Sequence, residues 1–431
     1  MADDVNGAGV GAGFDASLTK SDARPTPIAD AGRIDAIDTL RGFAIFGIYA
    51  VNITTFSWPS TAMNDPTAMG DTWWNRFGFT LTNTALTGKF MFIFALLFGA
   101  TIVFFDRKTT PTDREPRVRD GSGLWARRQG VLLAFGVAHA VFIWYGDILA
   151  PYAVVGLGIA WWLRKLSWTW HLGLGLAMHS LGSALLVGLF LLVTEFSGGD
   201  SSQQFESEMN AHTGGYFGLM LYRVVFVAIF WTIVGPIFAL QIGALMLWGI
   251  SLARAGILTA QRPVSYYAKW AMILLPVGAV LVGGAFGLMR SALGEETAGL
   301  AWVGVAQLIG VPLGLGYAAL VLWVSVAGAV PIVTKALANV GRMGLTNYLL
   351  QSVISAFVFY GWGLGFYAEI GYPGLFGVIA GMWAFNIAFS AAWLSVFRIG
   401  PVEWLWRALT YGTMPELRRS PGDGRPEAGA T

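Results

Sequence analysis

Apolar runs long enough to cross a bilayer recur along this chain of 431 residues. A membrane-spanning helix needs about 20 predominantly apolar residues. In lipid, only helices and closed barrels satisfy all their backbone hydrogen bonds, so runs of this length predict helices. The sequence therefore predicts an all-α, polytopic membrane helix bundle with about ten transmembrane helices. The runs lie at about 37–56, 87–105, 128–145, 148–163, 170–193, 224–252, 268–288, 300–330, 343–362 and 374–397.

Composition agrees with this fold class and excludes several kinds of site. Hydrophobic residues make up 55% of the chain and charged residues 12%, whereas an average soluble domain is about 25% charged. The chain has no cysteine, which excludes disulfides, thiolate metal sites and thiol nucleophiles. Its glycine-rich stretches lack the GxGxxG spacing of a nucleotide loop. We expect neither a metal site nor a nucleic-acid partner.

Basic residues gather in alternate connections between the runs, which predicts the topology. Short cytoplasmic loops hold most Lys and Arg of a membrane protein, so this set marks the inner side and both termini are predicted to be cytoplasmic. The opposite connections hold only Arg76, Arg223 and Arg290, with Lys89 just inside a run. The inner set is Arg107, Lys108, Arg114, Arg117, Arg119, Arg127, Arg164, Lys165, Arg254, Arg262, Lys335 and Arg342, followed by Arg407, Arg418, Arg419 and Arg425.

Two polar ends flank the predicted membrane domain. Residues 1–33 are polar and rich in Gly and Ala, without the charged-then-apolar pattern of a signal peptide. We expect 1–33 and 413–431 to be disordered cytoplasmic tails. Between them, 34–330 would form the N-terminal part of the bundle and 331–412 its C-terminal part.

The first apolar run contains charges and an amide. A span that begins near Ile37 draws Asp38 and Arg41 into the membrane, where an isolated ion costs about 2.5 to 3.5 kcal/mol at mid-depth. These two residues are three apart and can pair on one helix face. Asn52 shares the face of Arg41, roughly 16 Å further along the helix axis. The three residues form either an interfacial anchor with a packing amide or a functional polar stripe.

A histidine, an acid and a lysine are further candidates for chemistry. His139 is surrounded by apolar residues in the outer half of the third run, and Asp147 follows at a tight hairpin. Eight residues make about two helical turns, so both side chains can face one outer cavity. His139 is then either a general base that the acid orients or a buried neutral histidine bonded to a carbonyl. Lys89 is either functional or extends to the outer headgroups.

Polar residues near the C-terminus have a structural interpretation and a functional one. Asn347 and Gln351 are four apart on one helix face, as packing amides or as the wall of an inner polar pocket. Glu403 and Arg407 have i, i+4 spacing on a predicted interfacial helix, where the structural interpretation is favoured.

The sequence resembles the YeiB family of bacterial integral membrane proteins, whose C-terminal half is a domain of unknown function. The resemblance implies a multi-pass protein of the bacterial cytoplasmic membrane. The motifs that support it run in family order between Arg33 and Gly412: IDTLRGFAIFGIYAVNI, GKFMFIFALLFGA, HAVFIWYGDILAPYAVVG, GRMGLTNYLLQSVI and GPVEWLWRALTYG.

The first motif also resembles the heparan-alpha-glucosaminide N-acetyltransferases and, more distantly, the transmembrane acyltransferase superfamily. These enzymes pass an acetyl group from cytosolic acetyl-CoA to a sugar amine across a membrane, and Asn52 would correspond to their asparagine after the first helix. Their catalytic histidine, in the loop that follows, has no counterpart between Phe56 and Trp74. Their mechanism therefore does not transfer directly.

The resemblance implies an integral membrane acyltransferase that moves an acyl group, with acetyl expected first, from cytosolic acyl-CoA to an envelope glycan or lipid. Donor-side candidates are Arg41, Arg127, Arg128 and Arg342; acceptor-side candidates are Asn52, Lys89, His139 and Asp147. The expected partners are membrane lipid and the acceptor, and a homodimer is compatible with the sequence. The rival hypotheses are a transporter or exporter, for which a mid-membrane carboxylate would be expected, and a non-catalytic assembly partner.

Overall fold

The computed structural model describes residues 35–109, 121–196, 201–293 and 295–419 of the protein. The predicted tail 1–33 and most of 413–431 lie outside the described residues. Within the described ranges the chain is helical and contains no strand, apart from an isolated bridge between Phe397 and Arg418. The prediction of an all-α bundle is confirmed. The division of the membrane domain near residue 330 stays a prediction.

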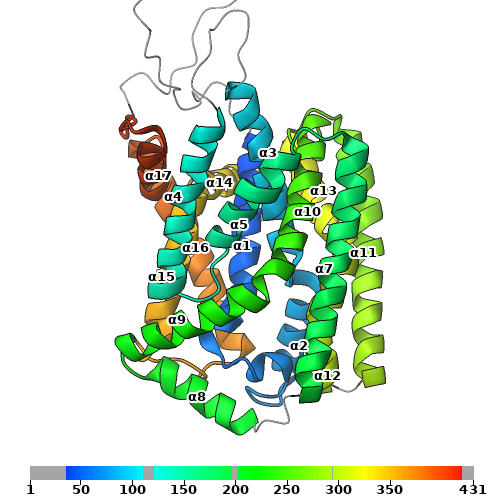
Figure 1. The fold of residues 1–431 in the computed structure, drawn as a ribbon, viewed down its shortest axis with the longest axis vertical. Helices are drawn as coiled ribbons and strands as arrows, with labels where there is room; N and C mark the ends of the chain where they lie inside the picture. Colours follow the sequence, from blue (N-terminus) through cyan, green and yellow to red (C-terminus); the bar gives the residue numbers. More distant parts are fainter. Residues whose placement is uncertain (1–34, 110–120, 197–200, 294, 420–431) are drawn as a thin grey trace, which may run out of the picture.

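Within the described ranges, eleven long helices form the body of the bundle, and Figure 1 shows most of them running along its long axis. They are α1 Asp35–Ser57, α3 Lys89–Thr109, α4 Gly121–Phe142, α7 Trp168–Phe196, α9 Tyr216–Ile233, α10 Gly235–Arg254, α11 Val264–Leu293, α12 Glu295–Ile309, α13 Val311–Ala327, α15 Gly344–Phe359 and α16 Tyr372–Val396.

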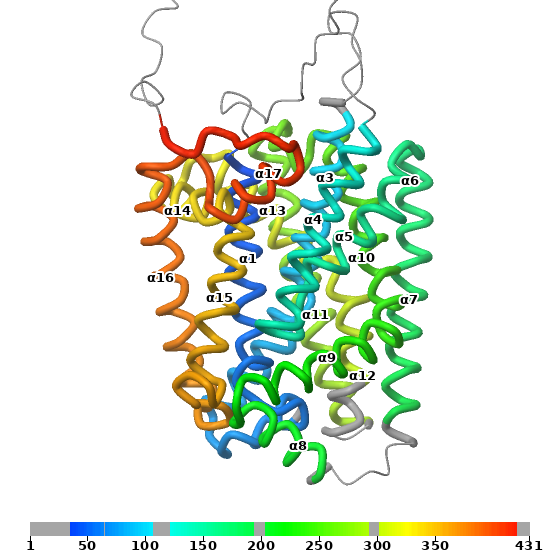
Figure 2. The backbone as a smooth tube through the Cα atoms, turned by 60° about the vertical axis from the view of Figure 1, so that its left-hand side comes forward, coloured from blue at the N-terminus to red at the C-terminus, as the bar shows by residue number. Residues whose placement is uncertain are grey.

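Shorter elements connect these helices. They are the 3-10 turn η2 Ala62–Asn64, α2 Trp73–Leu81, the π-helical η3 Thr82–Leu86, α5 Leu149–Val155, the π-helical η4 Gly156–Ala160, α6 Trp161–Leu163, α8 Ser201–Thr213, α14 Pro331–Arg342 and α17 Pro401–Tyr411. We call the end with α14 and α17 the inner end, and the end with α2 and α8 the outer end (Figure 2).

The helices are long and apolar enough for a multi-pass membrane protein. Among the described residues, seven helices pass that test, and an eighth span results if α12 and α13, bent by 51°, are taken together. The predicted sixth run, 224–252, instead forms the two helices α9 and α10, which separate beside Pro236, where proline lacks the N–H of a continuing helix. The count of ten spans stays a prediction.

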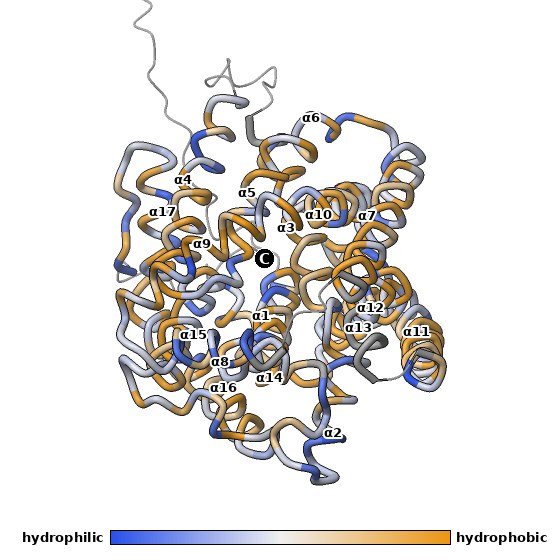
Figure 3. Tube along the Cα trace, turned by 60° about the horizontal axis from the view of Figure 1, so that its bottom comes forward, coloured by the Kyte–Doolittle hydropathy of each residue, from blue (hydrophilic) through white to orange (hydrophobic). Residues whose placement is uncertain are grey.

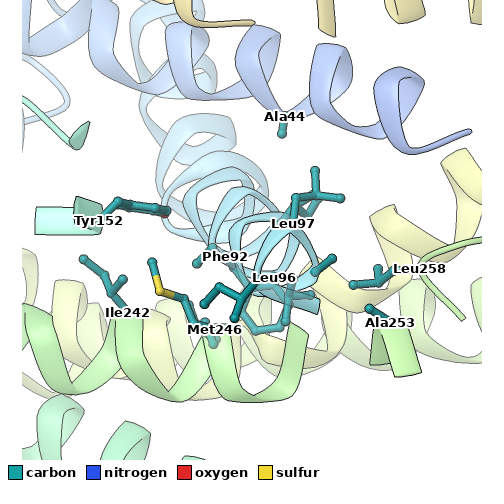
Figure 4. Packing of buried hydrophobic residues seen from close by; sticks show 14 of the residues in the cluster. Ala44, Phe92, Leu96, Leu97, Tyr152, Ile242, Met246, Ala253 and Leu258 are labelled. Atoms are coloured by element: carbon teal, nitrogen blue, oxygen red, sulfur yellow. The ribbon is translucent and has the colours of Figure 1, made fainter. Parts of the chain in front are cut away.

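The outermost helices expose apolar side chains, as expected for contact with lipid. On α11, Met272, Val280 and Leu288 are 65 to 74% exposed, and Figure 3 shows hydrophobic residues along this helix. A contiguous exposed apolar surface of this kind marks a membrane interface. Burial is concentrated around α1, α3 and α10. Figure 4 shows Leu96 of α3 against Met246 of α10, with Leu97 directed toward Ala44 of α1.

The connection between α4 and α5 turns inside the bundle, and α9 and α8 cross below it at the outer end (Figures 1 and 2). Two side chains of α9 hold this arrangement, because Tyr216 and Arg223 both donate to the carbonyl oxygen of Phe142 at the end of α4, at 2.9 and 3.2 Å. The sequence predicted a tight hairpin at the outer edge. The structure instead covers that hairpin with helices, so Asp147 lies well inside the protein.

The two ends of the described chain, Asp35 and Arg419, lie at the inner end of the bundle (Figure 2). If this end faces the cytoplasm, a cysteine in place of Met414, which is 79% exposed, should react with an impermeant maleimide only in inverted vesicles. A cysteine in place of the exposed Asn210 of α8 should react in intact cells. The natural chain has no cysteine to interfere. The reverse pattern would overturn the predicted orientation.

Candidate functional site

A cavity of about 340 Å³ lies in the inner half of the bundle, lined by residues of α1, α3, α4, α5, α14, α15 and α17. Its charged lining residues come from the first turns of α1, from α4, from the end of α14 and from α17: Asp38, Arg41, Arg128, Arg342, Glu403 and Arg407. Its apolar residues lie deeper, on α1, α3, α5 and α15, and include Ile48, Phe94, Leu149, Tyr152 and Tyr348. The cavity therefore has a charged inner end and an apolar deep end.

Hydrogen bonds fix the acidic groups at the charged end. Arg41 donates to the Asp38 carboxylate at 2.6 Å, which confirms the pairing expected from their spacing. Glu403 accepts the backbone N–H groups of Leu345 and Thr346 at 2.6 and 3.0 Å, so its carboxylate caps the N-terminus of α15. Burial raises the pKa of Glu403, and these hydrogen bonds oppose that increase.

Arg128 is held against α17 by an aromatic contact. Its guanidinium carbon lies 3.8 Å from the ring centre of Trp406, and the indole N–H of Trp406 donates to the Arg128 carbonyl at 3.1 Å. Stacking on an aromatic face orients an arginine while leaving its planar N–H groups available for bidentate recognition of anions. The interfacial helix predicted near Glu403 thus forms part of the cavity wall.

A close helix crossing places Arg342 at the cavity. Gly42 of α1 faces the backbone of Leu337, and Gly341 of α14 faces the Asp38 carbonyl, so neither glycine has space for a Cβ atom. Two small residues let the backbones of α1 and α14 touch, which is common between membrane helices. Arg41 also donates to the Gly341 carbonyl at 3.4 Å, and the next residue, Arg342, lines the same cavity as Arg41.

His139 and Asp147 form a buried pair just beyond the deep end of the cavity. Nδ1 of His139 lies 2.9 Å from Oδ1 of Asp147, and the other carboxylate oxygen accepts the Ala150 N–H at 2.7 Å. His139 is 1% exposed. Its Nε2 has no hydrogen-bond partner in the described part of the chain. An Nδ1–H that donates to a carboxylate leaves the lone pair on Nε2, as in the His of a catalytic triad.

One layer of side chains separates this pair from the cavity. Ile148, the residue after Asp147, lines the cavity, and its N–H donates to the Tyr348 hydroxyl at 3.4 Å. The Tyr348 ring lies 5.1 Å from the His139 imidazole, measured between centroids. A group at the deep end of the cavity would therefore contact the residues that enclose the pair.

The structure does not bring the other two acceptor-side candidates to this pair. Lys89 is 1% exposed, so it does not extend to headgroups, and its Nζ points to Gly310 at the bend between α12 and α13. Asn52 is half-buried on α1 and does not line the cavity. On the donor side, Arg41, Arg128 and Arg342 meet in the cavity, whereas Arg127 lies outside its lining, near Gly412.

The amides of α15 take part in packing. Asn347 donates to the Val340 carbonyl at 3.0 Å and to the Ser390 hydroxyl at 2.9 Å, and Gln351 donates to Asn386 at 2.8 Å. These bonds join α15 to α14 and α16, so the packing interpretation fits both residues. Sequence reasoning missed Tyr152, Tyr348 and Trp406, which form cavity walls, because nothing distinguishes them from the chain's other aromatic residues. Among the described residues, no group of three or more His, Asp or Glu could hold a metal ion.

Comparison with known proteins identifies the family of this chain. Residues 252–413 match the family "Protein of unknown function (DUF418)". The chain is 31% identical to "Uncharacterized protein YeiB" of Escherichia coli (strain K12) over 87% of this chain and 95% of that protein. It is 28% identical to "Uncharacterized protein YxaH" of Bacillus subtilis (strain 168) over 88% and 94% of the two chains. The chain therefore belongs to the YeiB family of membrane proteins.

Proposed function

We propose that this protein is an integral membrane acyltransferase that moves an acyl group, acetyl first, from cytosolic acyl-CoA to an envelope glycan or lipid. The observation that supports the proposal most is the cavity itself. It has arginines at one end, is apolar at the other, and stops one side-chain layer from a histidine whose partner is a carboxylate.

The charged end suits the phosphates of a CoA donor. Arginine forks bind phosphate oxygens through paired, charge-assisted hydrogen bonds, and Arg41, Arg128 and Arg342 meet there. The cavity volume of 340 Å³ falls within the range of about 300–1,000 Å³ that is usual for ligand pockets. In this arrangement the nucleotide stays at the arginines, the pantetheine arm enters the cavity, and the thioester reaches the apolar end beside Tyr348.

The reaction then needs a base beyond the thioester. The acceptor hydroxyl or amine gives its proton to Nε2 of His139 and forms a bond to the acyl carbon as the carbon–sulfur bond breaks. The proton on His139 then passes to the CoA thiolate. The products are the acylated acceptor and CoA with a free thiol. Asp147 orients the imidazole and stabilises its cationic form, as the acid of a triad does.

Donor binding can be tested on purified protein. Arg41→Ala and Arg342→Ala should each weaken acetyl-CoA binding roughly 10- to 100-fold, because a hydrogen bond to a charged group contributes about 1.5–3 kcal/mol. The loss should shrink at high salt, where phosphate contacts are screened. Isothermal titration in nanodiscs measures both effects. Lys335→Ala is the matched control, since Lys335 lies exposed on α14 outside the cavity. If the wild type and the three variants bound acetyl-CoA with equal affinity, the proposal that CoA binds in this cavity would be wrong.

One observation favours transport as a second candidate. Asp147 is 5% exposed, in the connection that α9 binds through the Phe142 carbonyl, so the chain does hold a carboxylate inside the bundle, as a coupled transporter would. Intramembrane acids of this kind often mark proton or substrate paths. A transporter needs no CoA, so substrate uptake by vesicles without acyl-CoA would favour this alternative.

A further inference from the structure

Arg223 of α9 is a fully buried cation, at 0% exposure, on the outer side of the His139–Asp147 hairpin. Nη1 donates to the Phe142 carbonyl at 3.2 Å. Nε and Nη2 have no hydrogen-bond partner among the described residues. The Tyr360 ring lies beside the guanidinium, with its centroid 5.0 Å from Cζ. The Tyr360 side chain also interacts electrostatically with the guanidinium, but two of the three buried guanidinium nitrogens lack an acceptor at ordinary hydrogen-bonding geometry among the described residues.

No carboxylate neutralises this arginine within the described chain. The carboxylate of Glu208, one turn before His212 on α8, instead accepts the N–H of Ser60 at 2.6 Å and the Ser60 hydroxyl at 2.5 Å. Arg223 forms no ion pair with Glu208 or with any other described acid. A buried charge is costly unless it is fully paired or hydrogen-bonded, so Arg223 is suited to an acceptor that comes from outside the described chain.

The neighbouring side chains have the same surplus of donors. The indole N–H groups of Trp144 and Trp362 are also buried without a partner among the described residues. Trp144 follows Phe142 by two residues, and Trp362 packs edge-on against Tyr216, which shares the Phe142 carbonyl with Arg223. An unsatisfied buried donor destabilises the folded state. His212 of α8 adds no second cation, because burial lowers its pKa to about 4. The cluster therefore combines one positive charge with several free donors, and a ligand that only accepts hydrogen bonds would satisfy it.

We propose that this outer cluster, formed by Arg223, Trp144, Tyr360 and Trp362, binds a phosphate group. Phosphate supplies negative charge and several acceptor oxygens, and a guanidinium is well suited to hold it. Trp144 also contacts the other site, with its ring 6.2 Å from the His139 imidazole. As an extension of the proposed function, the acceptor is then a phosphate-bearing lipid or glycan, whose phosphate is held at Arg223 while its nucleophile reaches His139.

The proposal is tested by thermal unfolding of the purified full chain in detergent. The probes are inorganic phosphate, a short-chain phosphatidylglycerol and, as the phosphate-free lipid, a short-chain diacylglycerol. A ligand that binds only the folded state raises the melting temperature. We expect stabilisation by phosphatidylglycerol and not by diacylglycerol, with the apparent Kd weakened at least tenfold in Arg223→Gln. Stabilisation by inorganic phosphate alone would support the site and assign it to free phosphate.

Controls keep this test separate from the donor site. Arg76→Gln removes an exposed arginine at the same end, which pairs with Asp71, and should bind like the wild type. If Arg223→Gln does not fold, Arg223→Lys retains the charge and can still donate to Phe142 but lacks the guanidinium fork, and should bind more weakly than the wild type. Acetyl-CoA binding is measured on the same samples. Loss of phosphate binding at Arg223 can then be distinguished from loss of acetyl-CoA binding in the inner cavity. Equal stabilisation of wild type and Arg223 variants, or equal stabilisation by diacylglycerol, would overturn the proposal.

Discussion

His139→Gln is expected to lower acyl transfer about 10²- to 10⁴-fold while acetyl-CoA binding stays unchanged, because removal of a positioned general base costs roughly that factor. Glutamine keeps a hydrogen bond to Asp147 but cannot take up the proton of the acceptor. The cavity does not include His139 among its lining residues, so the donor site should be intact. Turnover and donor affinity are measured on the same reconstituted protein.

His179→Gln is the matched control for this variant. His179 is also 1% exposed and bonds the Gln307 carbonyl at 3.0 Å, but on α7, away from the cavity. Its loss should lower the melting temperature and leave turnover per folded molecule unchanged. Asp147→Asn should lose less turnover than His139→Gln. Normal turnover by a well-folded His139→Gln protein would show that the histidine is structural, and would favour transport.

Gly341→Leu is expected to have the largest effect on stability. The Cβ of any side chain here would overlap the Asp38 carbonyl of α1, which belongs to the backbone and cannot rotate away. Overpacking usually costs about 1–3 kcal/mol, and more where the backbone must shift. Because α14 and α1 must separate, Arg342 should also leave Arg41, and acetyl-CoA binding should fall with the melting temperature.

Gly381→Leu tests whether this effect is specific to the helix crossing. Gly381 lies within α16 on an exposed face, with no atom within 4 Å of its Cβ position. The substitution places an apolar side chain toward lipid, so the melting temperature should stay close to that of the wild type. A Gly341→Leu protein as stable as Gly381→Leu would contradict the close approach of α1 and α14.

Local spacing was enough to predict several features of the site. Asp38 and Arg41 are three residues apart on one helix, and their ion pair follows from helical geometry alone. His139 and Asp147 are eight residues apart, across the last turn of α4 and the connection to α5, and they do contact each other. The charge asymmetry placed Arg41, Arg128 and Arg342 at one end of the bundle, where the structure joins them in a cavity. These features could be predicted because the residues are either close in the sequence or lie on the same predicted side of the membrane.

Features that depend on distant contacts could not be predicted. Lys89 starts a helix, so the sequence suggested a boundary position, but η3 and α2 continue before it and α12 and α13 bury it. The depth of the α4–α5 hairpin depends on α9, which covers it from about 70 residues further along the chain. The cavity walls Tyr348 and Trp406 come from helices that meet only in the folded protein. Sequence periodicity does not indicate which of the distant helices pack against each other.

Transfer of label from radiolabelled acetyl-CoA in inverted membrane vesicles tests the central claim most directly, because these vesicles contain the native acceptor and expose the predicted cytoplasmic face. Vesicles with the wild-type protein should incorporate acetyl into an envelope lipid or glycan and release one free CoA thiol for each acetyl transferred. Vesicles with His139→Gln should do neither while still binding acetyl-CoA. Wild-type vesicles that neither bind acetyl-CoA nor incorporate acetyl, with the protein present and folded, would contradict the account.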